Sequence, residues 1–428
     1  MLSARRIACG LRQGRRVCKR AAGEFGGTEG SARMKNAAIA HGGGPTAVLN
    51  ASLAAVCDAW AQHRECDSLF AAISGVWGIL NNDFVDLAEG PKERISASAQ
   101  APGSIIGSSR QALTDQDYDT ILEVFRKREI HCFFYTGGNG SMETALQLSR
   151  MARERRYELQ VIGIPKTIDN DLAVTDHTPG YPSAARFFIH AARDIGLDNR
   201  ALPSPVCILE ALGRNTGWIA AATALARFHS DDPPHLIYFP ERRLSLDRIA
   251  ADVERVYRRI GRVVIVVCEG QLDDQGAPFG ADVDRPDSTV HRLASNLAHT
   301  LAQELTRKLG LRARAEKPGL LGRSCGPLAS QVDRKESEAC GRAAVMAALA
   351  GETDKMVTLK RVSNSPYRCE TGLTELANVA RFERPLPDEW ISAGANDIAG
   401  GFHKFLAPLV GELEVFPEML SGDSVRTP

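Results

Sequence analysis

The sequence predicts an α/β fold of two or three lobes, in which mostly parallel sheets are flanked by helices. Two observations lead to this prediction. The chain has 428 residues, of which 44% are hydrophobic, so it can bury more than one core. From Met34 onward, short apolar runs alternate with longer amphipathic stretches, which is the pattern of repeated strand and helix units in a parallel sheet.

Seven short apolar runs are the expected strands, at 36–41, 68–73, 131–136, 160–164, 205–210, 235–239 and 262–268. Helices are expected between them, and two of these are the most clearly patterned. One spans 117–128, starts near Asp115 and Asp117, and would bury Tyr118, Ile121, Leu122 and Phe125; the other spans 141–154 and would bury Met142, Ala145, Leu146 and Leu148. We interpret these side chains as core.

The chain divides into four expected segments. Residues 1–34 are rich in arginine and poor in acids, so we expect a disordered leader, an organelle presequence or a start site placed too far upstream. Residues 35–204 and 205–340 are the expected first and second lobes. Residues 341–428 are expected to be helical and irregular and to pack on both lobes.

The composition excludes several classes of protein. Lys plus Arg equals Asp plus Glu at 52 each, so no overall field favours nucleic acid or an anionic membrane. No run reaches the roughly 18 consecutive apolar residues of a membrane span. The ten cysteines are scattered, without a CxxC pair or a zinc-ligand spacing, as expected for reduced thiols in the cytoplasm.

Two glycine-rich turns follow expected strands, at the end of the sheet where ligands usually bind. In Gly42-Gly43-Gly44, backbone amides could approach a phosphate closely, although many such segments are only tight turns. The second turn, 137–141, matches neither a P-loop nor a dinucleotide fingerprint. Its Asn139 nevertheless offers a neutral oxygen to a metal.

A third turn, Pro165 to Asp171, follows the expected strand 160–164. Asp169 and Asp171 lie two residues apart, and two carboxylates so close are costly to hold together unless cations share the site. Such a pair alone is common in solvated loops. Lys166, a divalent metal and an arginine could supply the cations.

Two turns of the second lobe carry further candidates. Leu212-Gly213-Arg214 follows the strand 205–210, and Arg214 could bind a transferring phosphoryl group. Glu269 ends the strand 262–268, where its carboxylate could accept hydrogen bonds from sugar hydroxyls. We therefore expect several strand ends to converge on one crevice.

From Met34 onward the chain resembles the 6-phosphofructokinase family. The motifs at 137–141, 165–171, 212–214 and 269–270 occur in the order of that family. The resemblance implies a two-lobed fold with mostly parallel sheets and the active site between the lobes. It assigns the phosphoryl donor to the first lobe and the sugar phosphate to the second.

The resemblance also implies the chemistry. Asp169 corresponds to the base that takes the proton of the 1-hydroxyl of fructose 6-phosphate, and Arg214 to the transition-state arginine. Lys166 completes the expected catalytic set, and Mg2+ is the expected cofactor, with Asn139 as its candidate ligand. Gly43, Arg110 and Gly140 fall on donor contacts, and Thr167, Asp171, Leu212, Gly213, Glu269 and Arg323 on substrate contacts.

The sequence leaves the second cationic contact to the 6-phosphate undecided between two residues. Arg314 and Lys317 compete for a second cationic position, of which we favour Arg314. Pro205 stands where many relatives have another arginine of this set. In many relatives one such arginine crosses from a neighbouring subunit, so the resemblance implies a homodimer or homotetramer.

The phosphoryl donor depends on conflicting positions. Lys166 is typical of pyrophosphate users, whereas Gly140 is typical of ATP users. Segments 42–50, 355–359 and 367–373 resemble a pyrophosphate-dependent subgroup, so we favour pyrophosphate, with ATP as the alternative. The expected products are fructose 1,6-bisphosphate and phosphate, in a reversible reaction of glycolysis and gluconeogenesis without allosteric regulation.

Two other classes of protein fit the sequence less well. A non-catalytic sugar-phosphate sensor would usually have lost the base or the arginine, but Asp169 and Arg214 are present. A lipid kinase or an NAD kinase would explain neither the 165–171 motif nor 212–214. We therefore expect an enzyme.

Overall fold

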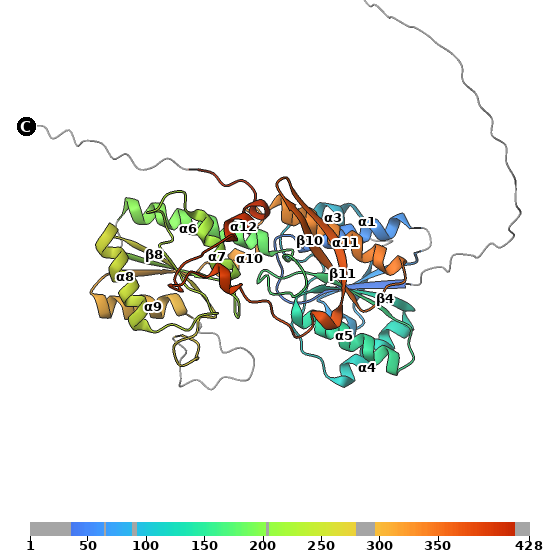
Figure 1. The fold of residues 1–428 in the computed structure, drawn as a ribbon. Coiled ribbons are helices and arrows are strands. Elements are labelled where there is room, and N and C mark those ends of the chain that lie inside the picture. The colour runs from blue at the N-terminus through green and yellow to red at the C-terminus, as the bar shows by residue number, and fades with distance from the viewer. Residues whose placement is uncertain (1–35, 64–65, 88–91, 203–204, 280–295, 416–428) are drawn as a thin grey trace, which may run out of the picture.

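The computed structural model describes residues 36–63, 66–87, 92–202, 205–279 and 296–415, which form two α/β lobes (Figure 1). The two-lobed fold with mostly parallel sheets, expected from the sequence, is confirmed. The leader 1–34 lies outside the described residues, as does the expected lobe boundary at 203–204.

The first lobe is built on a seven-stranded sheet with the order β11-β10-β5-β4-β1-β2-β3. Its strands are β1 Asn36–His41, β2 Leu69–Ala72, β3 Phe84–Asp86, β4 Ile130–Gly137, β5 Gln160–Pro165, β10 Lys355–Asn364 and β11 Tyr367–Glu375. Strands β2, β1, β4, β5 and β10 run parallel, and the edge strands β3 and β11 are antiparallel to their neighbours.

Helices cover both faces of this sheet because successive strand residues point to opposite sides. Ala37 and Ile39 of β1 pack with α1 Leu49–Gln62 and α11 Gln331–Leu349, whereas Ala38 packs with the helices of the other face. The helices of that face are α2 Val76–Leu80, α4 Asp115–Lys127 and α5 Asn139–Glu154, and α3 Lys92–Ser98 lies beside α1. The Thr114 and Asp117 side chains form a capping box that starts α4.

The second lobe has a four-stranded parallel sheet with the order β7-β8-β6-β9. The strands are β6 Val206–Ala211, β7 Leu236–Ile237, β8 Val263–Cys268 and β9 Ala313–Glu316. One face packs against α6 Tyr181–Ala201, α7 Trp218–Ala222 and α12 Phe402–Val410, and the other against α8 Leu246–Ile260 and α9 Leu297–Leu309. The short helices are α10 Leu321–Ser324, η1 Thr223–Ala226, η2 Leu376–Asn378 and η3 Asp388–Trp390.

The C-terminal region differs from its expected form. Residues 355–375 fold back onto the first lobe as the hairpin β10–β11, which the sequence did not predict. The chain then crosses between the lobes to α12, which packs on the second lobe (Figure 1). Leu146, expected in the core, is only half-buried.

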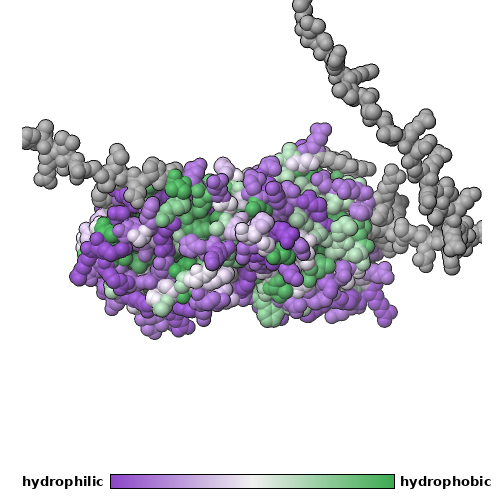
Figure 2. Space-filling view, turned by 45° about the horizontal axis from the view of Figure 1, so that its top comes forward, coloured by the Kyte–Doolittle hydropathy of each residue, from purple (hydrophilic) through white to green (hydrophobic). Residues whose placement is uncertain are grey.

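The surface agrees with the charge balance of the sequence. In the view of Figure 2, hydrophilic residues cover most of both lobes, with apolar residues in small groups. Among the described residues, no helix is both long enough and apolar enough to cross a membrane.

Candidate active site between the lobes

The turns that follow β1, β4 and β5 meet the turns that follow β6 and β8. One hydrogen bond joins the two groups directly: the Thr216 hydroxyl donates to the carbonyl oxygen of Asp169 at 3.0 Å. The strands of each sheet end at the same edge because they run parallel. The convergence of strand ends expected from the sequence therefore occurs.

Lys166 is the most enclosed cation of the site. Its side chain is only 3% exposed and donates to the carbonyl oxygens of Gly42 at 2.6 Å and Gly44 at 2.8 Å. Gly43 between them has φ +79°, and a Cβ there would lie 3.2 Å from the Lys166 ammonium. Burial and the nearby Arg110 lower the pKa of Lys166 to about 7.

Two guanidinium groups approach the same turn. A Cβ at Gly44 would lie 2.8 Å from Nη1 of Arg323 and 3.0 Å from Nη2 of Arg110. Burial and then Arg110 lower the pKa of Arg323. Three cations so close repel one another unless anions join them. This cluster, Lys166, Arg110 and Arg323, is suited to a polyanionic ligand such as a chain of phosphates.

Asp169 lies next to this cluster. Burial, followed by the charges of Asp171 and Glu269, raises the pKa of Asp169 to about 7, while Arg214 and Lys166 oppose the shift. Its backbone N–H donates to the Thr167 hydroxyl at 3.2 Å. A carboxyl group with a pKa near neutrality can accept a proton from a substrate at physiological pH.

Asn139 and Asp171 each have one buried side-chain oxygen without a hydrogen-bond partner among the described residues. The amide of Asn139 donates to Oδ2 of Asp171 at 2.9 Å. Oδ1 of Asn139 and Oδ1 of Asp171 are buried and receive no hydrogen bond from any residue that the structure describes. Mg2+ prefers oxygen ligands and is often held by one or two protein groups together with substrate phosphates. These two oxygens therefore fit Mg2+.

The second lobe supplies a compact turn. Gly213, with φ +125°, donates its N–H to the Glu269 carboxylate at 3.3 Å, and its carbonyl accepts from Gly270 N at 3.2 Å. A Cβ at Gly270 would clash with the carbonyl of Arg214. Leu212 contacts α10, the helix that carries Arg323, because a Cβ at Gly322 would lie 3.5 Å from its Cδ1. Leu212, Gly213, Glu269 and the helix α10 that carries Arg323 thus lie close together.

Arg314 is exposed in β9, in register with Cys207 near the start of β6, whereas the site lies beyond the last β6 residue, Ala211. Within one chain Arg314 therefore lies away from the other site residues, and its role in binding the 6-phosphate stays a prediction. Its competitor Lys317 lies at the strand end, 2.7 Å from the Glu210 carboxylate. Gly140 is exposed at the start of α5, and a Cβ there would meet nothing within 4 Å.

Sequence reasoning also missed Arg384, whose guanidinium binds the carbonyl oxygen of Asn170 at 2.9 Å. Asn170 lies between the two acidic residues of the site. Arg384 belongs to the polar C-terminal region, where no strand end or glycine-rich turn marks it as part of a site. Only the fold brings it there.

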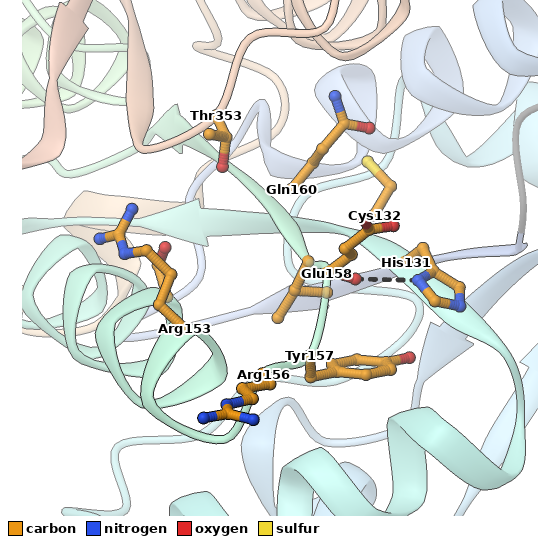
Figure 3. A pocket seen from close by; sticks show the side chains of 10 residues that line it. His131, Cys132, Arg153, Arg156, Tyr157, Glu158, Gln160 and Thr353 are labelled. Atoms are coloured by element: carbon orange, nitrogen blue, oxygen red, sulfur yellow. Dashed lines mark hydrogen bonds between the residues drawn. The ribbon is translucent and has the colours of Figure 1, made fainter.

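A separate hollow of about 700 Å3 opens near the starts of β4 and β5 (Figure 3). Arg153 and Arg156 point away from His131 there, and His131 bonds the carbonyl of Glu158 at 2.8 Å. Other polar groups of its lining bind protein atoms: Ser149 and Arg153 bond Asp354, Gln160 bonds Ala348, and Thr353 bonds Val161. No side-chain atom of this lining is among the buried, unpartnered polar atoms of the described residues, unlike Oδ1 of Asn139 and Oδ1 of Asp171 between the lobes.

Comparisons with known proteins show which family the chain is similar to. The family model described as phosphofructokinase matches residues 36–348. A pyrophosphate–fructose 6-phosphate 1-phosphotransferase of Rhodospirillum rubrum is 39% identical over 380 residues, which are 87% of this chain and 93% of that protein. A sulfofructose kinase of Alkalicoccus urumqiensis is 33% identical over 358 residues, 83% of this chain and 91% of that protein.

The fold has a similar counterpart among solved structures. The pyrophosphate-dependent phosphofructokinase of Marinobacter aquaeolei superposes with a TM-score of 0.80 at 33% identity, covering 91% of this chain and 94% of that one. Both lobes are therefore included in the similarity.

Proposed function

Because the chain belongs to the phosphofructokinase family, we propose that it transfers a phosphoryl group from pyrophosphate to the 1-hydroxyl of fructose 6-phosphate. The products are fructose 1,6-bisphosphate and phosphate. The observation that carries the choice of donor is the buried ammonium of Lys166 under the turn Gly42–Gly44. A phosphate that leaves without a nucleotide has no other group to spread its charge, so a fixed cation there stabilises it directly.

The acid–base step is assigned to Asp169. Its ionised carboxylate takes the proton of the 1-hydroxyl while the hydroxyl oxygen bonds to the transferred phosphorus and the bond to the leaving phosphate breaks. Arg214 lies close enough to lower the pKa of Asp169, so its charge is also near the transferred group. An arginine there stabilises the negative charge of the transition state.

Mg2+ is the proposed cofactor, held by Oδ1 of Asn139 and Oδ1 of Asp171 together with donor phosphates. The bound ion would neutralise the charge of the donor and hold it for in-line transfer. Asn139 and Asp171 keep each other in place through the bond between the Asn139 amide and the Asp171 carboxylate.

ATP is the second candidate donor, and one observation favours it. The open space beside Gly140 leaves room for groups larger than pyrophosphate at the start of α5. Initial rates with pyrophosphate and with ATP, each with fructose 6-phosphate and Mg2+, decide between them. We expect a much larger kcat/KM with pyrophosphate. A larger value with ATP would reject the choice of donor and leave the acceptor unchanged.

A non-catalytic sensor would behave differently in the same experiment. It would bind fructose 6-phosphate in calorimetry and show no turnover with either donor. Reversibility is tested by starting from fructose 1,6-bisphosphate and phosphate. The role in glycolysis and gluconeogenesis, the cytoplasmic location, the homodimer or homotetramer and the absence of allosteric regulation stay predictions.

A further inference from the structure

Arg384 binds the backbone of the catalytic turn at several points. Its Nη2 donates to the carbonyl oxygen of Asn170 at 2.9 Å, and its Nη1 donates to those of Thr175 at 2.5 Å and Asp176 at 2.8 Å. Its backbone N–H donates to the carbonyl of Asp171 at 2.8 Å. One residue thus holds both ends of the segment 170–176.

The same residue is fixed from the second lobe. Trp218, which is 1% exposed, donates its indole N–H to the Arg384 carbonyl at 3.1 Å, and its ring lies 4.7 Å from the Arg384 guanidinium carbon. The Glu241 carboxylate accepts from the N–H groups of Leu386 at 2.8 Å and Gly217 at 2.9 Å. Arg384 therefore has a rigid base from which to hold the turn.

A second link runs beside the first. The Asn215 amide donates to both carboxylate oxygens of Glu383, at 2.8 and 2.9 Å. Leu172 and Glu383 form an isolated antiparallel bridge. Asn215 directly follows Arg214, so the segment 383–386 contacts the turn of the arginine as well as the turn of the base.

The local sequence stiffens this segment. Arg384 precedes Pro385, and Leu386 precedes Pro387. Proline fixes its own φ and restricts the preceding residue to extended conformations. The segment therefore loses little freedom when it binds between the lobes. Burial lowers the pKa of Arg384 only to about 10, so the guanidinium stays charged at neutral pH.

The catalytic turn needs such support. Asn170 has φ +54°, a left-handed conformation that residues other than glycine adopt infrequently. Such conformations persist when the surroundings hold them. The Asn170 side-chain oxygen accepts from Thr178 N at 2.9 Å, and Arg384 holds its carbonyl. Asp169 and Asp171 flank this residue, so its conformation sets the direction of both carboxylates.

We propose that Arg384 is a positioning residue that holds Asp169 and Asp171 in their reactive orientation and couples their turn to the Arg214 turn of the second lobe. This proposal rests on the proposed function, since Arg384 itself contacts neither reacting group. Loss of its hydrogen bonds should lower the rate of transfer and leave the affinity for fructose 6-phosphate almost unchanged.

The test uses the full chain with Arg384→Met and Arg384→Lys. We expect kcat to fall by about 100-fold in Arg384→Met, because a displacement of about 1 Å at the reacting groups can have an effect of this size. Arg384→Lys keeps the charge but lacks the planar guanidinium group, so its kcat should lie between those of wild type and Arg384→Met. The KM for fructose 6-phosphate should stay within about threefold of wild type, because binding contacts are retained.

Arg361→Met is the matched control. Arg361 also binds Asp176, at 2.9 Å, and a backbone carbonyl, that of Phe405 at 2.7 Å, with its guanidinium carbon 4.6 Å from the Phe405 ring. Within the described chain it donates to none of the carbonyls of 169–171. We expect Arg361→Met to lower Tm and to keep kcat close to wild type.

Two further measurements separate positioning from general destabilisation. Guanidinium added to Arg384→Ala should restore part of kcat, because the free cation can occupy the vacated place. Hydrogen exchange of peptides covering 166–178 should be faster in Arg384→Met than in Arg361→Met, and this readout needs no reaction. Wild-type kcat in Arg384→Met, or equal exchange in both variants, would overturn the proposal.

The proposed function and the positioning role of Arg384 can be rejected independently of each other. If wild type shows no transfer with pyrophosphate or ATP, the function is rejected, while the exchange experiment still shows whether Arg384 holds the turn. If wild type is active and Arg384→Met, like Arg361→Met, lowers Tm but keeps kcat close to wild type, the positioning role is rejected and the function stands.

Discussion

The ammonium of Lys166 lies 2.6 Å from the carbonyl oxygen of Gly42 and is held there by burial. We predict that Lys166→Met lowers kcat with pyrophosphate by about 100-fold or more, the usual effect of removing one fixed group that stabilises developing negative charge. Initial rates at saturating pyrophosphate and fructose 6-phosphate measure this. Lys355→Met is the control, since Lys355 lies on β10 in an ion pair with Glu375, and its kcat should match wild type.

The rate should depend on pH through two groups. Burial raises the pKa of Asp169 to about 7 and lowers that of Lys166 to about 7. The base must be ionised, and the ammonium protonated, so kcat/KM should describe a narrow bell centred near pH 7. In Lys166→Met the fall at alkaline pH should disappear. If the kcat/KM of the variant still falls at alkaline pH, a group other than Lys166 causes that fall.

Asp169 should also affect stability in a direction that depends on pH. Its pKa rises from 3.8 to about 7, mainly through burial. Between these values the folded protein keeps a proton that the unfolded chain has lost, so this group weakens the folded state as the pH rises through that range. We predict that Asp169→Asn has a higher Tm than wild type at pH 8, and that the difference narrows at pH 5.

The control for this measurement is a carboxyl group whose pKa shifts in the opposite direction. Arg155 holds the pKa of Asp119 below its usual value, so the ionised carboxylate of Asp119 favours the folded state at neutral pH. Asp119→Asn should therefore leave Tm unchanged or lower it at pH 8. An equal rise of Tm in both variants would indicate a general effect of net charge rather than the burial of Asp169.

The fold could be predicted where strands are buried on both faces. The runs 36–41, 160–164 and 262–268 are continuous and apolar, and they become β1, β5 and β8. The strand β9 and the hairpin β10–β11 were missed because much of their length is polar and exposed. Pairing with a neighbouring strand, rather than an apolar pattern, makes these segments strands.

The site could be predicted in part for a related reason. Strand ends and glycine-rich turns marked Lys166 and Asp169, and parallel topology brings them together. The position of Arg314 beside the start of β6 could not be predicted, because the register between β9 and β6 depends on tertiary packing. Arg384 was missed because its contacts with Asn170 require the path of the C-terminal region between the lobes.

The Mg2+ requirement should change when Asn139 is altered. Asn139→Ala removes one unpaired oxygen and the hydrogen bond that orients Asp171. We predict that the Mg2+ concentration for half-maximal rate rises by about 10-fold or more, as is usual when a group that ligates or orients at a metal site is lost. Asn139→Asp keeps an oxygen and adds a charge next to Asp171, so its rate at high Mg2+ should be reduced less than that of Asn139→Ala.

Binding of Mn2+ in the presence of pyrophosphate can be followed by the magnetic resonance signal of the ion, which gives a readout independent of turnover. Equal Mn2+ affinity in wild type and Asn139→Ala would place the metal elsewhere.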